Sequence, residues 1–132
     1  MRLQRQTIFG APSGNCFATA VACVFDLDVA DVPNFCAPPE KGWGDRFEAW
    51  CRDRGLQPLF FETENFPGWV EACSPKQVVI ASGPAARGLL HTCVYRGGEL
   101  LWDPHPDDTG LESVKDVLFF AQIEPRLPKG AE

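Results

Sequence analysis

Residues 14–27 read GNCFATAVACVFDL, and this stretch decides how the amino-terminal part of the chain folds. Its small and apolar side chains continue for about three helical turns, which is typical of a helix buried within a domain. A loop of residues 12–14 precedes it. We expect Ser13 or Asn15 to cap the helix, because a short oxygen-bearing side chain accepts the free amide hydrogens of the first turn. Cys16 then stands at the helix entrance.

The rest of the sequence predicts a second helix and then mainly strands. The helix is expected over residues 45–54, where apolar residues recur at three-to-four spacing and Gly55 ends it. Strands are expected at residues 56–62, 77–82, 89–96, 99–103 and 117–123, with a short helix or loop at 65–73 and a frayed tail at about 125–132. Helices followed by antiparallel strands indicate an α+β domain. Since the 132 residues contain no linker, we expect one domain, residues 1–132.

Composition excludes several classes of function. The 12 Lys and Arg residues against 18 Asp and Glu residues give a net charge of −6, and no basic run is present, so nucleic acid is not an expected partner. The apolar stretches are far shorter than the roughly 20 residues that cross a bilayer. The polar first residues lack the apolar core of a secretory signal, which favours a cytoplasmic location.

The cysteines point to reduced thiols rather than to bridges or metal. Six of them stand singly, at positions 16, 23, 36, 51, 73 and 93, without a CxxC pair. We therefore expect no structural zinc and no cofactor. Cys16 differs from the others because the free amides at a helix start lower the pKa of a thiol and stabilise the thiolate. Cys23 follows on about the same face of that helix, where a small buried packing role is expected.

A second local feature supplies a base for Cys16. The chain has two histidines, and Gly97-Gly98 is a typical hairpin turn between strands that carry His91 and Asp103. A three-residue loop places His91 directly opposite Asp103, and a two-residue loop leaves them neighbours. A carboxylate beside an imidazole fixes its tautomer and stabilises the imidazolium. The sequence thus predicts a Cys16, His91 and Asp103 triad.

This order of residues resembles that of the papain-like cysteine peptidases. Gly14-Asn15-Cys16 opens a helix, and the His and the carboxylate follow on later strands. The chain is most similar to compact bacterial members, such as double-glycine-leader peptidase domains and NlpC-type amidases. The resemblance implies a papain-like fold and a polar oxyanion-hole residue upstream of the nucleophile. Gln6 is the candidate, working with the Cys16 amide, provided that residues 8–14 fold back, and Asn15 is the alternative.

The expected function is thiol-dependent hydrolysis of an amide or related acyl bond, as in a peptidase, amidase or deamidase. A peptide or protein substrate is expected in a cleft between the helices and the sheet, roofed by residues 33–44 and 83–88. Trp43, Trp102 and His105 are candidates for its wall. Two alternatives stay open: a transglutaminase-like acyltransferase, and a protein-binding module that keeps the fold without using the thiol.

Overall fold

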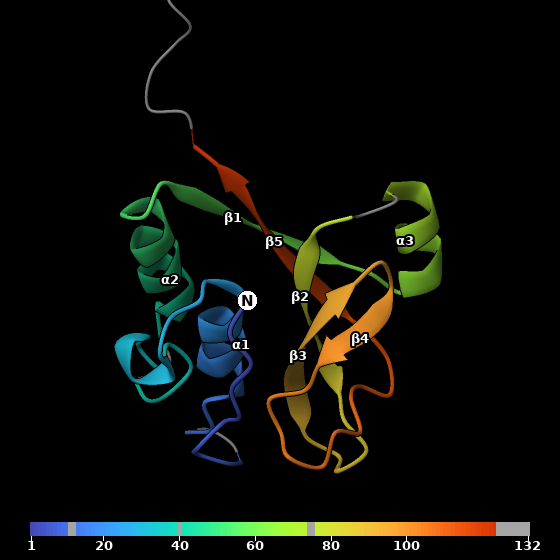
Figure 1. Ribbon diagram of the computed structural model, residues 1–132, viewed down its shortest axis with the longest axis horizontal. Helices are drawn as coiled ribbons and strands as arrows, with labels where there is room; N and C mark the ends of the chain where they lie inside the picture. Colours follow the sequence, from blue (N-terminus) through green and yellow to red (C-terminus); the bar gives the residue numbers. More distant parts are fainter. Residues whose placement is uncertain (11–12, 40, 74–75, 124–132) are drawn as a thin grey trace, which may run out of the picture.

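The computed structural model describes residues 1–10, 13–39, 41–73 and 76–123, so the tail predicted at 125–132 lies outside the described residues. Helices and strands are mixed along the chain (Figure 1). Their order is α1 (Cys16–Val24), a 3-10 turn η1 (Val29–Asp31), α2 (Trp43–Arg52), β1 (Leu56–Glu62), α3 (Phe66–Cys73), β2 (Val78–Pro84), β3 (Leu90–Arg96), β4 (Glu99–Trp102) and β5 (Asp116–Gln122).

The strands form one sheet in the order β1-β5-β2-β3-β4, and every neighbouring pair is antiparallel. The last strand, β5, therefore lies between β1 and β2 in the interior of the sheet. The α+β class predicted from the sequence is confirmed. The short helix or loop expected at residues 65–73 is the helix α3, which lies between β1 and β2, so the coarser expectation that helices precede the sheet holds only for α1 and α2.

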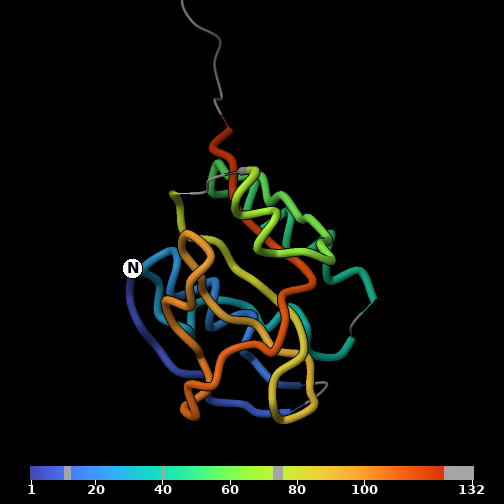
Figure 2. Tube along the Cα trace, turned by 90° about the vertical axis from the view of Figure 1, so that its right-hand side faces the viewer, coloured from blue at the N-terminus to red at the C-terminus, as the bar shows by residue number. Residues whose placement is uncertain are grey.

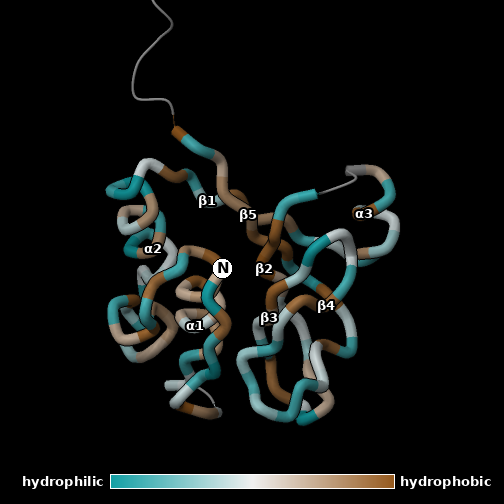
Figure 3. Tube along the Cα trace, in the orientation of Figure 1, coloured by the Kyte–Doolittle hydropathy of each residue, from teal (hydrophilic) through white to brown (hydrophobic). Residues whose placement is uncertain are grey.

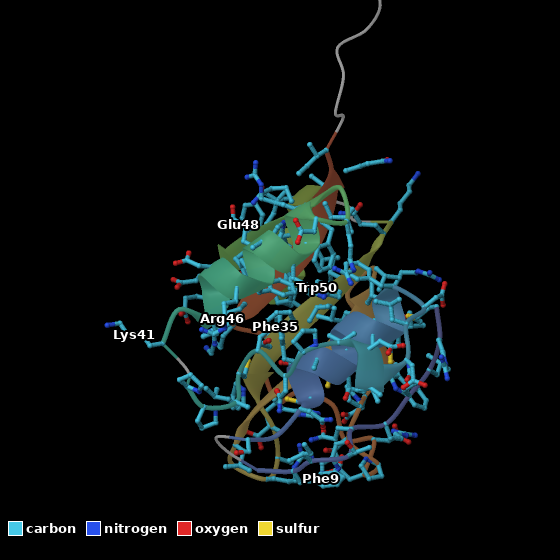
Figure 4. All side chains as sticks on the ribbon, turned by 90° about the vertical axis from the view of Figure 1, so that its left-hand side faces the viewer. Phe9, Phe35, Lys41, Arg46, Glu48 and Trp50 are labelled. Atoms are coloured by element: carbon cyan, nitrogen blue, oxygen red, sulfur yellow. The ribbon has the colours of Figure 1, made fainter. Side chains whose placement is uncertain are left out.

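Helices α1 and α2 cover one face of the sheet, as Figures 1 and 4 show from two directions. Phe17 and Val21 of α1 and Phe47 of α2 pack there with Ile80, Val94 and Leu118 from the strands. The rings of Phe17 and Phe47 meet edge to face, with centroids 5.0 Å apart. Burial of this apolar surface holds the helices on the strands and fixes the direction in which α1 points.

Helix α3 lies on the opposite face. Its Phe66 and Trp69 pack against a second apolar cluster that includes Val79, Tyr95 and Val117. Alternate residues of each strand thus serve the two faces, as the two-residue period of a strand requires. The hydropathy colouring agrees, since apolar segments are concentrated in the central strands between the two helical layers (Figure 3). No helix in the described part of the chain is long and apolar enough to cross a membrane.

The hairpin between β3 and β4 has the shorter of the two loops considered from the sequence. Arg96 pairs with Glu99, which leaves Gly97 and Gly98 as a two-residue turn with φ of 58° and 85°. Such positive φ values are what this turn requires and what glycine adopts without strain. Tyr95 pairs with Leu100 but Val94 pairs with Trp102, so the register shifts by one residue. Because β4 contains one extra residue at this point, Trp102 and the following Asp103 are shifted by one position relative to β3.

The amino-terminal segment runs beside the loop that follows β4 (Figure 2). The Gln6 amide donates to the Pro104 carbonyl at 2.9 Å, and the Trp102 ring donates to the Gln4 carbonyl at 2.7 Å. The segment then folds back, because Asn15 N donates to Ile8 O at 3.0 Å. The fold-back that the sequence required for Gln6 is present. Gln6, the start of α1 and the end of β4 consequently meet in one region.

Candidate active site

His91 and Asp103 form the centre of the site. His91 Nε2 and Asp103 Oδ1 are 2.6 Å apart, and both side chains are almost completely buried. His91 is near the start of β3 and Asp103 directly follows β4, so one local hairpin places both. The prediction that these residues are neighbours is confirmed.

Asp103 is held as a carboxylate by several donors. The backbone amide of His105 donates to Oδ1 and that of Gly110 to Oδ2, each at 2.8 Å. Burial alone would raise the pKa of Asp103, but the hydrogen bonds from His91 and from these two amides outweigh it and hold the pKa below its ordinary value. Because Asp103 is ionised, Nε2 of His91 carries a proton and donates it. Nδ1 is then the basic nitrogen of the ring.

His91 is neutral at ordinary pH. Burial lowers the pKa of the imidazole below 6.5, and the hydrogen bond to Asp103 offsets only part of this effect. Among the described residues, Asp103 is the one hydrogen-bond partner of the ring. The arrangement thus presents a neutral imidazole whose tautomer is fixed and whose Nδ1 is available to accept a proton.

Cys16 is the first residue of α1, as predicted. Its thiol lies near Thr92, the residue next to His91, and the polar groups of Thr92 together with the backbone amides of Cys16 and Phe17 favour the thiolate form. The predicted lowering of its pKa is nevertheless wrong. Burial raises the pKa of the Cys16 thiol above 9.0, and these polar groups only reduce that rise. The raised pKa favours the protonated thiol of Cys16, and no hydrogen bond joins it to the His91 ring among the described residues.

The two oxyanion candidates differ in how their side chains are used. Gln6 is buried, and its Nε2 donates to the Ile8 carbonyl at 3.0 Å. Because a carbonyl only accepts, this bond fixes which end of the amide carries nitrogen. One hydrogen on Nε2 is left over, and Oε1 has no partner. Gln6 thus has the donor capacity that an oxyanion hole needs.

Asn15 is occupied elsewhere. Its Oδ1 accepts from the backbone amides of Thr7 and Ile8, and its Nδ2 donates to Thr7 Oγ1, all at 3.0 Å. Asn15 stands at the N-cap of α1, but its side chain makes no capping bond to the helix, contrary to the prediction. Its role in the structure is to fasten the segment that carries Gln6. Of the two predicted capping residues, Asn15 thus occupies the N-cap position and Ser13 does not.

One cavity of about 680 Å³ connects the candidates, with Gln6, Cys16 and His91 all in its wall. Trp43 and His105 also line it, as predicted. Trp102 is not in its wall: its ring contacts the Arg5 guanidinium at 3.9 Å and fastens the amino-terminal segment. The predicted roof is represented by Cys36 and Trp43 from the first loop and by Gly83 and Arg87 from the second.

Sequence reasoning missed three supporting residues. Thr92 lies near the Cys16 thiol, and the Cys93 thiol lies close to the Asp103 carboxylate. Arg5 donates to the carbonyls of Asp103 and His105 at 2.7 and 3.0 Å and also pairs with Asp108. Nothing in the sequence marks Arg5, which is far from these residues in the chain. The sequence could have indicated Thr92 and Cys93, because they directly follow His91 in the same predicted strand.

His91, Cys93 and Asp103 also form a potential metal-binding set, with donor atoms all within 4.8 Å of one another. Imidazole, thiolate and carboxylate are ordinary zinc ligands. Here the donor atoms interact with one another instead. Nε2 of His91 donates to Asp103. Burial and the nearby Asp103 charge raise the pKa of the Cys93 thiol, which disfavours the thiolate that would bind a metal. The observed bonding is that of an orienting network for an imidazole.

Comparison with known proteins places no family beside this site: no family model, no curated protein and no solved structure matches the chain.

Proposed function

We propose that the chain is a thiol-dependent amide hydrolase with a papain-like arrangement, in which Cys16 is the nucleophile, His91 the base and Asp103 the residue that orients the base. The observation that carries the proposal is the 2.6 Å bond between His91 Nε2 and Asp103 Oδ1 in the wall of a cavity that Cys16 shares. The fixed tautomer leaves Nδ1 free to accept the thiol proton.

The proposed reaction begins with transfer of the Cys16 proton to His91 Nδ1 while Sγ attacks the carbonyl carbon of an amide. The resulting oxyanion accepts hydrogen bonds from the Cys16 backbone amide and from the second Nε2 hydrogen of Gln6. The C–N bond then breaks, and the leaving amine takes the proton from His91. Water attacks the thioester with His91 again as base, the C–S bond breaks, and the acid leaves as the thiol is restored.

The raised pKa of Cys16 shapes this mechanism. Because thiol and imidazole are both neutral at rest, proton transfer must accompany attack rather than precede it. An amine in place of water as the acceptor would make the same site a transglutaminase-like acyltransferase, and a peptide or protein amide is the substrate class we propose.

The test is acylation by an activated ester. Full-length protein is mixed with 4-nitrophenyl hexanoate, release of 4-nitrophenol is followed, and the acylated residue is mapped by mass spectrometry. We expect an acyl group on Cys16, none in Cys16→Ala, and a normal adduct in the control Cys23→Ala. His91→Ala should slow acylation by about 10²- to 10⁴-fold, and EDTA should have no effect. Acylation spread over other cysteines, or unaffected by Cys16→Ala, would refute the proposal.

A non-catalytic binding module is the second candidate, and the raised pKa of the half-buried Cys16 thiol is the observation that favours it. In that case the cavity would hold a ligand without reacting. The same experiment separates the two functions, since a binding module gives neither 4-nitrophenol release nor a covalent adduct at Cys16.

A further inference from the structure

We propose that the substrate of this site carries a large apolar acyl group, which lies in the cavity beyond Cys16 on the side of α2 and β1. This inference rests on the proposed function and adds the class of group that the site selects. The cavity of about 680 Å³ is in the range of pockets that enclose a whole small ligand, far more space than the reacting carbonyl needs.

The direction of the cavity follows from the order of the strands. His91 is on β3, Ile80 on β2, Leu118 on β5 and Phe60 on β1, and all four line the cavity. Since the strand order is β1-β5-β2-β3-β4, the wall runs across the sheet from His91 to Phe60. The amine that leaves must be near His91, which protonates it. The acyl group bonded to Cys16 is therefore directed toward Phe60.

The wall at that end is mainly apolar, although Ser82 of β2 and Asp116 of β5 also line the cavity. It is built by aromatic and aliphatic side chains from two helices and three strands, namely Phe17, Trp43, Phe60, Ile80 and Leu118. Trp43 and Phe60 meet edge to face with ring centroids 6.3 Å apart. Each methylene that leaves water for such a wall gains about 0.8 kcal/mol, so binding should rise steadily with acyl length.

Exposed apolar side chains surround the cavity. Leu90 is 83% exposed, Phe9 53% and Phe60 50%, although all three line it. Solvent-exposed apolar groups gathered at one cavity are typical of a ligand-binding site. Arg87 also lines the cavity, but its guanidinium is paired with Asp107 and does not offer a free charge to an acidic substrate.

Strand β1 offers a matched pair of variants. Phe60 lines the cavity and packs toward Phe47 of α2, whereas Phe61 stacks on Phe119 with centroids 5.3 Å apart. The two rings are adjacent in the chain and similarly exposed, at 50% and 43%. Only one of them faces the proposed acyl group. Phe60→Ala and Phe61→Ala thus differ in the cavity and little else.

The experiment measures kcat/KM of the full-length protein for 4-nitroanilides with acetyl, butanoyl, hexanoyl and octanoyl groups. We expect a rise of about fourfold per added methylene. Phe60→Ala should lower the octanoyl value by about tenfold and leave the acetyl value nearly unchanged, while Phe61→Ala should match the parent. In parallel, tryptophan fluorescence of the Cys16→Ala variant measures binding of acetamide, hexanamide and octanamide, which do not react.

The outcomes separate this inference from the proposed function. Hydrolysis of all four anilides at equal rates would overturn the apolar acyl group and leave the hydrolase standing. An equal effect of Phe60→Ala and Phe61→Ala would also overturn it. No hydrolysis of any anilide, with octanamide bound more tightly than acetamide, would overturn the hydrolase and support an apolar ligand in the same cavity.

Discussion

The two sides of the cavity differ in how completely their polar atoms are paired. On the strand side, Asp103 receives hydrogen bonds at both oxygens, from His91 and from two backbone amides. On the side of the amino-terminal segment and α1, Oε1 of the buried Gln6 has no partner, and burial raises the pKa of the Cys16 thiol. In the proposed mechanism, His91 and Asp103 are thus fully paired before substrate arrives, whereas Cys16 and Gln6 keep hydrogen-bonding capacity for the substrate.

This difference has a physical reason. A charged carboxylate is tolerated in the interior only when hydrogen-bond donors surround it. The buried Asp103 carboxylate therefore requires all of its donors in order to remain ionised. A neutral thiol and one orphaned amide oxygen cost much less, and a substrate that hydrogen-bonds to them recovers that cost. If the comparison is correct, substitutions on the two sides should have very different effects on the free energy of unfolding.

The largest effect is expected on the strand side. Asp103→Ala removes a buried charge partner and leaves His91 and the amides of His105 and Gly110 without an acceptor, so it should lower the free energy of unfolding by about 3–5 kcal/mol. Urea unfolding followed by circular dichroism measures the change. The control Asp108→Ala removes an exposed partner of Arg5 and should change little. Comparable losses in the two variants would show that the Asp103 network is not special.

The next effect concerns the fastening of the amino-terminal segment. Asn15→Ala leaves the amides of Thr7 and Ile8 without their side-chain acceptor, and we expect a loss of about 1–3 kcal/mol. Asn15→Asp is the matched control, because it keeps both acceptor bonds, and its second oxygen can accept from the Thr7 hydroxyl where Nδ2 now donates. The same urea titration compares them. An Asp variant as unstable as the Ala variant would contradict the role given to Oδ1.

Whether a feature of the fold or the candidate site could be predicted from the sequence depends on how far apart in the chain the residues that form it are. The neighbourhood of His91 and Asp103 follows from one glycine turn and two strands, so local pattern reasoning found it. The register shift between Val94 and Tyr95 was missed because no residue type marks the added residue on β4. The position of β5 between β1 and β2 is a long-range pairing that periodicity does not encode.

The prediction of a lowered pKa for Cys16 was wrong for the same reason. Its location at a helix start is local and was predicted, but its burial depends on Thr92 and on the strand that brings Thr92 to the helix. Desolvation then outweighs the favourable amides. Trp102 was taken for a pocket wall, yet its ring is used by Arg5 and Gln4, both from a segment almost a hundred residues away. Burial and partner choice are tertiary properties.

The pH dependence of stability tests the burial of His91 on the strand side. Because burial lowers the pKa of His91, the unfolded chain takes up a proton near pH 6.5 that the folded chain does not. Stability should therefore fall as the pH drops below 6.5, by at most about 1.4 kcal/mol per pH unit from this residue, until the folded pKa is passed. Urea midpoints at pH 7.5, 6.5 and 5.5 measure the slope. His91→Gln should have a shallower slope, and an unchanged one would exclude His91 as the source.

The smallest effect on stability is expected at Gln6. Gln6→Met removes an amide whose oxygen is unpaired and loses one bond, to Ile8, so the free energy of unfolding should change by less than about 1 kcal/mol. Hydrolysis should nevertheless fall by about 10²-fold or more, because an oxyanion donor is lost.

Gln4 provides the matched control for this last prediction. Its Nε2 donates to Leu27 O at 2.6 Å and its Oε1 accepts from Val29 N at 2.9 Å, so both ends of the amide are paired. Gln4→Met should cost about 1–2 kcal/mol of stability and leave kcat/KM of the folded protein near that of the parent. The two glutamines are thus expected to have different roles: Gln4 stabilises the fold, and Gln6 supports the reaction. If Gln6→Met is the more unstable variant and retains full activity, Gln6 serves only to hold Ile8, and the oxyanion hole must be built from backbone amides alone.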